Sequence, residues 1–159
     1  MVIVVMGVSG SGKTTVGQAL AARLGVDYAE ADEFHPPENI ARMSSGTPLN
    51  DDDRRPWLNA IAAWIGNHPQ GGVVTCSALK RKYRDVLARG GDVFFLHLDG
   101  TRELIAGRLA ERKGHFMPPA LLDSQFADLE PLHEDERGAV ISIDATPEEL
   151  TEAAIRATR

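Results

Sequence analysis

The chain has 159 residues, of which 43% are hydrophobic, and its 23 acidic side chains outnumber the 17 basic ones, giving a formal net charge of −6. This length and apolar fraction fit one compact domain, which we expect to span residues 1–159. The acidic balance argues against a nucleic-acid-binding face, and a single cysteine, Cys76, excludes an intramolecular disulfide. No stretch is long and apolar enough for a membrane span, so we expect a cytoplasmic protein with no nucleic acid and no membrane among its partners.

The first predicted elements are a strand over the apolar run 2–6 and a glycine-rich loop directly after it. Residues 7–14 read Gly-Val-Ser-Gly-Ser-Gly-Lys-Thr and match the nucleotide-phosphate loop G-x-x-x-x-G-K-[ST] at every specified position. The glycines let backbone N–H groups surround anionic oxygens, Lys13 adds a mobile charge, and the hydroxyl of Thr14 suits Mg²⁺. A helical pattern follows and ends at Gly25, so this segment predicts a polyphosphate site at a helix N-terminus.

Four further runs predict strands, a weak one near 27–29 and stronger ones at 72–76, 92–98 and 139–143. Helical patterns separate these runs, so the chain is expected to form successive βαβ units. We therefore predict an α/β fold with a central parallel sheet of about five strands and helices on both faces. Ligands bind such sheets at the carboxyl ends of the strands.

Several helix starts can be read from the sequence. The acidic run 51–53 and Pro56 mark the start of one helix, and Ser77 is a candidate N-cap for the helix that follows the third strand, 72–76. Thr101 is the candidate cap of the next helix, and Thr146 begins a capping box.

The segment 113–119 interrupts a helical pattern and is followed by a short helical stretch, 120–129. We interpret residues 113–130 as a mobile lid. A loop packed permanently on the body of the domain is the alternative.

Asp32 is the candidate acceptor-side residue. It follows the weak second strand, at the expected carboxyl edge of the sheet, and His35 comes shortly after it. A carboxylate there can orient an acceptor hydroxyl and receive its proton. The alternative is an ordinary loop or N-cap aspartate.

Two pairs of basic residues are spaced four apart. Lys80 and Arg84 would share a helix face, and an anion held between them and Arg54 would offset their repulsion. The alternative is that all three face solvent. Arg108 and Arg112 precede the predicted lid and can neutralise charge on a transferred phosphoryl group, or else pair with nearby carboxylates.

Taken together, these motifs resemble the gluconokinase family. The resemblance is carried by the phosphate loop and by residues 31–40, 46–58, 76–85, 113–117 and 125–131. It implies a nucleoside-monophosphate-kinase-like fold, commonly homodimeric, that transfers the γ-phosphoryl group of ATP to the 6-hydroxyl of D-gluconate with Mg²⁺.

The resemblance also implies roles for individual residues. The phosphates of ATP would be bound by Gly7, Ser9, Gly10, Ser11, Gly12, Lys13, Thr14 and Thr15. The acceptor would be bound by Asp32, His35, Arg54, Ser77, Lys80, Arg84 and His115. Catalysis would fall to Lys13, Asp32, Arg108 and Arg112, and Thr14 would hold the metal. The alternatives are a kinase of shikimate, another sugar acid or a nucleoside monophosphate, a nucleotide-dependent switch, and a non-catalytic relative.

Overall fold

The computed structural model describes residues 1–47, 49–111 and 119–158. In chain order the elements of these ranges are β1 (Val2–Met6), α1 (Lys13–Leu24), β2 (Asp27–Glu30), the 3-10 helix η1 (Ala31–Phe34), α2 (Pro37–Ser44), α3 (Asp51–Gly66), β3 (Gly72–Thr75), α4 (Arg81–Ala88), β4 (Val93–Asp99), α5 (Arg102–Glu111), α6 (Pro119–Asp128), β5 (Gly138–Ser142) and α7 (Pro147–Ala157). Arg112, His115 and the first part of the predicted lid lie outside the described residues.

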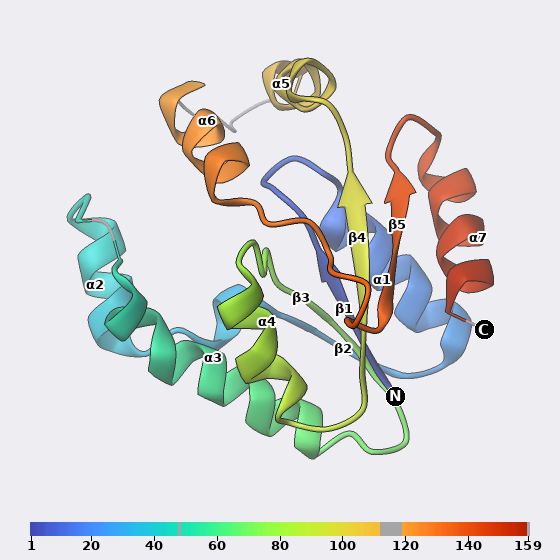
Figure 1. Ribbon diagram of the computed structural model, residues 1–159, viewed down its shortest axis with the longest axis horizontal. Coiled ribbons are helices and arrows are strands. Elements are labelled where there is room, and N and C mark those ends of the chain that lie inside the picture. The colour runs from blue at the N-terminus through green and yellow to red at the C-terminus, as the bar shows by residue number, and fades with distance from the viewer. Residues whose placement is uncertain (48, 112–118, 159) are drawn as a thin grey trace.

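The described strands form one sheet in the order β2-β3-β1-β4-β5, and every neighbouring pair is parallel (Figure 1). The central strand is β1, in which Val2 pairs with Gly72 of β3 and with Val93 of β4. The weak second run is the edge strand β2, where Asp27 is exposed and Ala29 is buried. The predicted parallel sheet is confirmed, and the edge position accounts for the mixed composition of β2.

Helices cover both faces of this sheet (Figure 1). Helices α1 and α7 pack together on one face, and α3 and α4 pack together on the other. Side chains of β1 alternate between the two cores: Ile3 and Val5 face α1 and α7, whereas Val2, Val4 and Met6 face α3 and α4. Because both faces are covered, an uninterrupted apolar run is the sequence that this central strand requires.

The predicted caps of α5 and α7 are confirmed. Thr146 and Glu149 form a reciprocal capping box at the start of α7. At the start of α5 the hydroxyl oxygen of Thr101 accepts a hydrogen bond from the N–H of Leu104 at 3.2 Å. Each cap satisfies backbone donors that the helix itself cannot pair.

Two other helix starts differ in detail from the prediction. In α3 the capping box is formed by Asn50 and Asp53, so the acidic run occupies the first turn as expected, while Pro56 lies inside the helix. The prediction that Ser77 caps the helix after β3 is wrong, because α4 begins only at Arg81. The intervening loop leaves Ser77 at the carboxyl end of the sheet, where it is available to a ligand.

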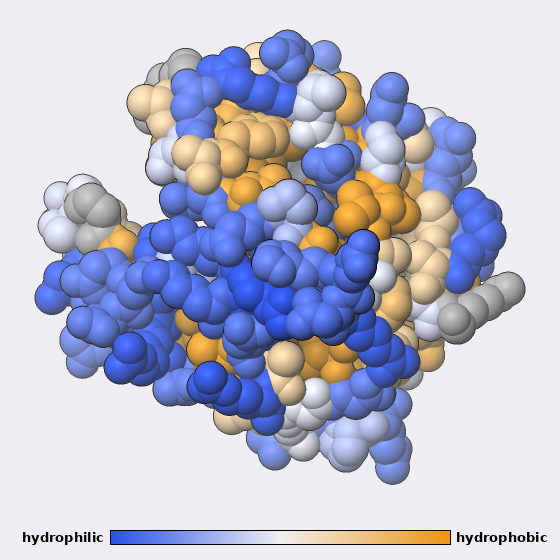
Figure 2. Space-filling view, viewed as in Figure 1, coloured by the Kyte–Doolittle hydropathy of each residue, from blue (hydrophilic) through white to orange (hydrophobic). Residues whose placement is uncertain are grey.

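The carboxyl ends of the strands point toward α5 and α6 (Figure 1). On the face shown in Figure 2 the surface over α3 and α4 is mainly hydrophilic, whereas hydrophobic residues are exposed between α6 and α5. Leu121 of α6 is 48% exposed. None of the helices in the described ranges combines the length and the apolar character needed to cross a membrane.

Candidate active site

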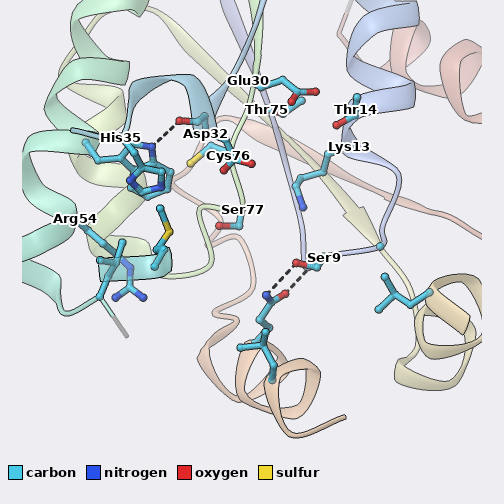
Figure 3. Close-up of a pocket in the computed structure, with 18 of the residues that line it drawn as sticks. Ser9, Lys13, Thr14, Glu30, Asp32, His35, Arg54, Thr75, Cys76 and Ser77 are labelled. Atoms are coloured by element: carbon cyan, nitrogen blue, oxygen red, sulfur yellow. Dashed lines mark hydrogen bonds between the residues drawn. The ribbon is translucent and has the colours of Figure 1, made fainter. Parts of the chain in front are cut away.

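A cleft of about 860 Å³ opens at the carboxyl ends of β1, β2 and β3. The phosphate loop forms one wall, and η1, the start of α3 and the loop after β3 form the others, with α6 at the mouth (Figure 3). This cleft brings together eight residues that sequence analysis selected: Ser9, Gly10, Lys13, Thr14, Asp32, His35, Arg54 and Ser77.

The phosphate loop has the geometry of an anion cradle. Gly10 and Gly12 have φ angles of 83° and 92°, which only glycine adopts without strain. Nζ of Lys13 donates hydrogen bonds to the carbonyl oxygens of Gly7 and Val8, at 2.9 and 3.0 Å, so the ammonium lies along the loop. Because α1 begins at Lys13, its first N–H groups have no partner within the helix and are directed at this loop.

The donor set of the loop fits a polyphosphate. Ser11 is fully buried, and its hydroxyl has no hydrogen-bond partner among the residues that the structure describes. Hydroxyl, backbone N–H and ammonium groups are all suited to phosphate oxygens. Gly7, Ser11 and Gly12 of the loop lie outside the lining of the cleft, as does Thr15, which is exposed on α1, so the phosphate contacts of these four residues stay predictions.

A carboxylate and two hydroxyls meet at the inner end of the cleft. Figure 3 shows Glu30, from the end of β2, beside Thr75 and Thr14. The hydroxyl of Tyr28 donates to Oε1 of Glu30 at 2.9 Å, and burial together with this carboxylate raises the pKa of Tyr28 to about 12. Sequence analysis did not select Glu30, although its place at a strand end, two residues before Asp32, was the available signal.

No group of three or more His, Cys, Asp or Glu side chains in the described ranges is arranged to hold a metal ion. A divalent cation beside Thr14 and Glu30 would therefore take its remaining oxygen ligands from phosphates and water, which is how Mg²⁺ is usually bound at nucleotide sites.

The wall opposite the phosphate loop carries Asp32, which η1 places in the cleft (Figure 3). His35 stacks on Trp57 with ring centroids 4.5 Å apart, and Nε1 of Trp57 donates to the carbonyl oxygen of Ala31 at 2.7 Å. These contacts fix η1 against α3. Burial lowers the pKa of His35, although the nearby Asp32 opposes this shift, so the imidazole is neutral at pH 7.

Basic residues gather around Tyr83 of α4. Nη1 of Arg54 donates to the Tyr83 hydroxyl at 3.2 Å, and this hydroxyl donates to Oδ1 of Asp51 at 2.6 Å. The guanidinium of Arg54 lies 5.7 Å from the ring centroid, and the ammonium groups of Lys80 and Lys82 each lie 5.8 Å from it. Arg54 and Lys80 therefore lie beside the same aromatic ring, which attracts both cations. Asp51 pairs with Arg54 at 3.6 Å and also with Lys82, and of the three cations Arg54 lines the cleft, so the contact of Lys80 with the acceptor stays a prediction.

The prediction that Arg84 binds the acceptor is wrong. Its guanidinium is fully buried and is engaged by both carboxylate oxygens of Glu136, at 2.7 and 3.1 Å, and by the carbonyl oxygen of Ala78 at 2.9 Å. Nor do Lys80 and Arg84 share a helix face, because Lys80 occupies the extended N-cap position before α4.

Arg84 instead braces the loop between β3 and α4. Ala78 in that loop has a φ angle of 46°, a left-handed conformation that is costly for a residue with a side chain. Burial is the largest single influence on Glu136 and opposes its ionisation, but the hydrogen bonds from Arg84 and from the N–H of His133, together with the charges of Arg84 and Arg81, lower the pKa of Glu136. The ion pair therefore stabilises the strained loop that presents Ser77 to the cleft.

The remaining predicted site residues, Arg108, Arg112 and His115, lie next to or within the predicted lid in the sequence. Arg108 donates a hydrogen bond to the carbonyl oxygen of Ile143, beyond the end of β5, and does not line the cleft. A contact with a phosphoryl group would require this side chain to leave Ile143, so its catalytic role stays a prediction. Arg112 and His115 lie outside the described residues.

Comparison with known proteins agrees with this geometry. The family model described as shikimate kinase matches residues 9–158. The gluconokinase of Gluconobacter oxydans (strain 621H) is 48% identical, over 97% of this chain and 89% of its own. The crystal structure of a gluconokinase from Sinorhizobium meliloti 1021 has a TM-score of 0.90 at 44% identity, over 98% of this chain and 89% of that chain. The shikimate kinase of Aquifex aeolicus, at 15% identity and a TM-score of 0.65 over 99% of this chain and 96% of that chain, shows the shared fold. The extent of these matches, on a fold and a cleft built as described, makes this kinase a member of the gluconokinase family.

Proposed function

We propose that the protein transfers the γ-phosphoryl group of ATP to the 6-hydroxyl of D-gluconate, which gives 6-phospho-D-gluconate and ADP. The observation that carries this proposal is the cleft, in which a phosphate loop faces a carboxylate, Asp32, with a cationic group, Arg54, on the same side as the carboxylate. The gluconokinase names of relatives such as the 48% identical Gluconobacter protein support D-gluconate as the acceptor.

On the donor side, the N–H groups of the phosphate loop, Lys13 and Thr14 bind the phosphates of ATP. Thr14 and Glu30 are the groups suited to hold Mg²⁺, which when bound neutralises charge on the transferring phosphoryl group. Lys13 lies along the loop and adds a positive charge to the same region.

On the acceptor side, Arg54 and Lys80 bind the carboxylate of gluconate, and His35 and Ser77 contact its hydroxyl groups. Asp32 accepts a hydrogen bond from the 6-hydroxyl and takes its proton as the new oxygen–phosphorus bond forms. The bond between the γ-phosphorus and its bridging oxygen breaks, and ADP departs with that electron pair. Catalysis on this scheme consists mainly of positioning and electrostatic stabilisation.

The lid, the homodimer and the cytoplasmic location belong to the same proposal. Residues 113–130 would close the mouth of the cleft, where α6 already contributes Leu121 and Gln125. Arg108 and Arg112 would then approach the phosphates and His115 the acceptor. Size-exclusion chromatography with light scattering tests the dimer, which a mass near the 17.2 kDa of one chain would contradict.

An acceptor panel tests the proposed reaction. ADP release is measured with ATP and each of D-gluconate, shikimate and uncharged D-glucose, because the match to the shikimate kinase family model makes shikimate the second candidate. We expect kcat/KM for D-gluconate to exceed the other two by at least about a hundredfold. Uncharged D-glucose cannot accept a charged hydrogen bond from Arg54, and the rigid ring of shikimate holds its carboxylate and hydroxyl groups at a different separation from those of the open-chain sugar acid. Faster turnover of shikimate, or ADP release that no acceptor stimulates, would refute the proposal.

A further inference from the structure

The side chain of Gln125 ties α6 to the phosphate loop. Its Oε1 accepts a hydrogen bond from the N–H of Ser9 at 2.7 Å, and its Nε2 donates to Oγ of Ser9 at 3.0 Å (Figure 3, dashed lines at Ser9). The orientation of the amide follows from chemistry, because a backbone N–H can only donate and must therefore face the carbonyl oxygen of the side chain.

This pair of bonds determines where the Ser9 hydroxyl can donate. Oγ of Ser9 accepts a hydrogen bond from Nε2 of Gln125, so the hydroxyl proton of Ser9 is left for an acceptor other than Gln125. Ser9 lines the cleft together with Gly10 and Lys13, and its hydroxyl therefore serves as a donor on the wall that binds phosphates.

Gln125 also lies at the boundary between the two halves of the site. Besides the main cleft, it lines a smaller cavity of about 180 Å³ whose other walls include Arg54, Ser77 and Tyr83. The glutamine thus contacts the phosphate loop and also borders a cavity that the acceptor-side residue Arg54 lines.

We propose that Gln125 is a positioning residue for phosphoryl transfer: by engaging both the N–H and the Oγ of Ser9, it directs the Ser9 hydroxyl at the terminal phosphoryl group of ATP. Donors that are oriented in advance stabilise a charged phosphoryl group without reorganisation during the reaction. ADP lacks this group, so the effect of Gln125 on binding should distinguish the triphosphate from the diphosphate. This inference rests on the proposed function only for the identity of the acceptor, D-gluconate. The contact between Ser9 and the nucleotide does not depend on it.

A double-mutant cycle tests the proposal. Gln125→Met keeps the length of the side chain and removes both hydrogen bonds, and Ser9→Ala removes the hydroxyl. Calorimetry gives Kd for ADP and for an ATP analogue with a nitrogen between the β- and γ-phosphorus atoms. We expect each single variant to raise the ratio of Kd for the analogue to Kd for ADP by about tenfold, the effect of one hydrogen bond to a charged group, and the double variant to raise it no further.

Activity gives a second readout. With D-gluconate, Gln125→Met should lower kcat by about tenfold and change KM for gluconate by less than about twofold, because the lost interaction is with the transferring group. Gln125→Glu should have a larger effect, since a carboxylate accepts from both donors of Ser9 and turns the hydroxyl away from the phosphate. It also serves as the second variant if the methionine variant fails to fold.

Three results would overturn the inference. They are additive effects of the two substitutions on the Kd ratio, equal weakening of ADP and the analogue, and an unchanged ratio. Gln18→Met, at an exposed glutamine of α1, controls for the substitution itself and should leave the ratio unchanged. If the unmodified protein binds the analogue but does not phosphorylate D-gluconate, the proposed function fails while the Kd ratios still decide the role of Gln125.

Discussion

Asp32 and Arg54 lie on the same side of the cleft, but the proposed reaction requires opposite properties of them. Asp32 must accept a proton and has to approach the reacting hydroxyl, whereas Arg54 must hold a charge at the far end of the acceptor. The surroundings suit these roles. The stack of His35 on Trp57 fixes the segment that carries Asp32, and the hydroxyl of Tyr83 accepts a hydrogen bond from Arg54.

Replacing Asp32 by Asn should lower kcat by roughly 10²- to 10⁴-fold, the usual contribution of a general base. The amide keeps the shape of the side chain but cannot take a proton at neutral pH, so Kd for ATP should stay within about twofold of its original value. Steady-state kinetics and calorimetry measure the two effects, with Asp52→Asn, at an exposed aspartate of α3, as the control. A variant at Asp32 that turns over at a near-normal rate would show that this carboxylate is not the base.

Replacing Arg54 by Met should raise KM for D-gluconate by about 10- to 100-fold and change kcat by less than about threefold, because a charged hydrogen bond to the bound acceptor is lost. Tyr83→Phe should give a smaller rise of about threefold, since it removes only the hydroxyl that positions Arg54. The neighbouring Arg55, whose side chain is exposed, provides the control as Arg55→Met. If the Arg54 and Arg55 variants have the same KM, Arg54 does not bind the acceptor.

At the scale of elements, the loop between β3 and α4 depends on a contact that is remote in sequence. Glu136 lies 52 residues after Arg84, in the segment that leads into β5, and the ion pair between them is fully enclosed by the protein. A buried ion pair stabilises the folded state little more than two well-packed apolar side chains would. Removing one partner is costly, because the other charge stays buried without that counter-charge. The loop that carries Ser77 and Ala78 therefore depends on both partners.

Arg84→Met should lower the free energy of unfolding by about 3 kcal/mol, the low end of the cost of breaking a buried pair, because Arg81 then remains as a cation 3.7 Å from the Glu136 carboxylate. Urea denaturation measures the change. Arg55→Met is the matched control, since the exposed Arg55 pairs with Asp52 at the surface, and it should cost no more than about 1 kcal/mol. Equal losses for the two variants would contradict the bracing role of Arg84.

Features that depend on neighbouring residues could be predicted from the sequence, whereas contacts between distant residues could not. The phosphate loop, the individual strand segments and the caps at Thr101 and Thr146 depend on residues that are close in the chain, so local patterns were sufficient for them. The role of Arg84 depends on Glu136, and the Ser9 contact depends on Gln125, which is 116 residues away. No periodicity or motif records such pairings, and spacing alone therefore misplaced Arg84.

At the scale of the whole molecule, the cations gathered near the cleft contrast with the negative net charge of the chain. The chain carries a formal net charge of −6, yet three cations, Arg54, Lys80 and Lys82, lie beside the ring of Tyr83 with one carboxylate, Asp51, among them, and Arg54 lines the cleft. Local cations attract a small anion over a distance of about a Debye length, roughly 8–10 Å at physiological salt, beyond which the acidic surface is screened. An acidic protein can thus bind two anionic substrates in one cleft.

Stability should fall in acid. The pKa of Asp51 is lowered to about 2 by hydrogen bonds from Lys82 and Tyr83. Burial raises the pKa of Glu136, but Arg84, the N–H of His133 and Arg81 together lower it below its ordinary value. A carboxyl group whose pKa is lowered by folding stabilises the fold above its unfolded pKa and loses this contribution as pH falls through its folded pKa. The free energy of unfolding should therefore decline below a pH of about 4.5, the ordinary pKa of a glutamate.

Urea denaturation between pH 7 and pH 3 measures this decline. Glu136→Gln removes one of the responsible groups, so its curve should be flatter than that of the unmodified protein over the same range. Parallel curves would show that Glu136 does not contribute to the acid sensitivity.

The central claim is that this cleft phosphorylates D-gluconate at its 6-hydroxyl. Phosphorus and proton NMR of the product formed from ATP, Mg²⁺ and D-gluconate test it most directly. The proposed reaction predicts one phosphomonoester whose phosphorus is coupled to the two protons on carbon 6, formed in equal amount with ADP. A phosphate on any other oxygen of the sugar acid, or no phosphorylated sugar acid at all, would contradict it.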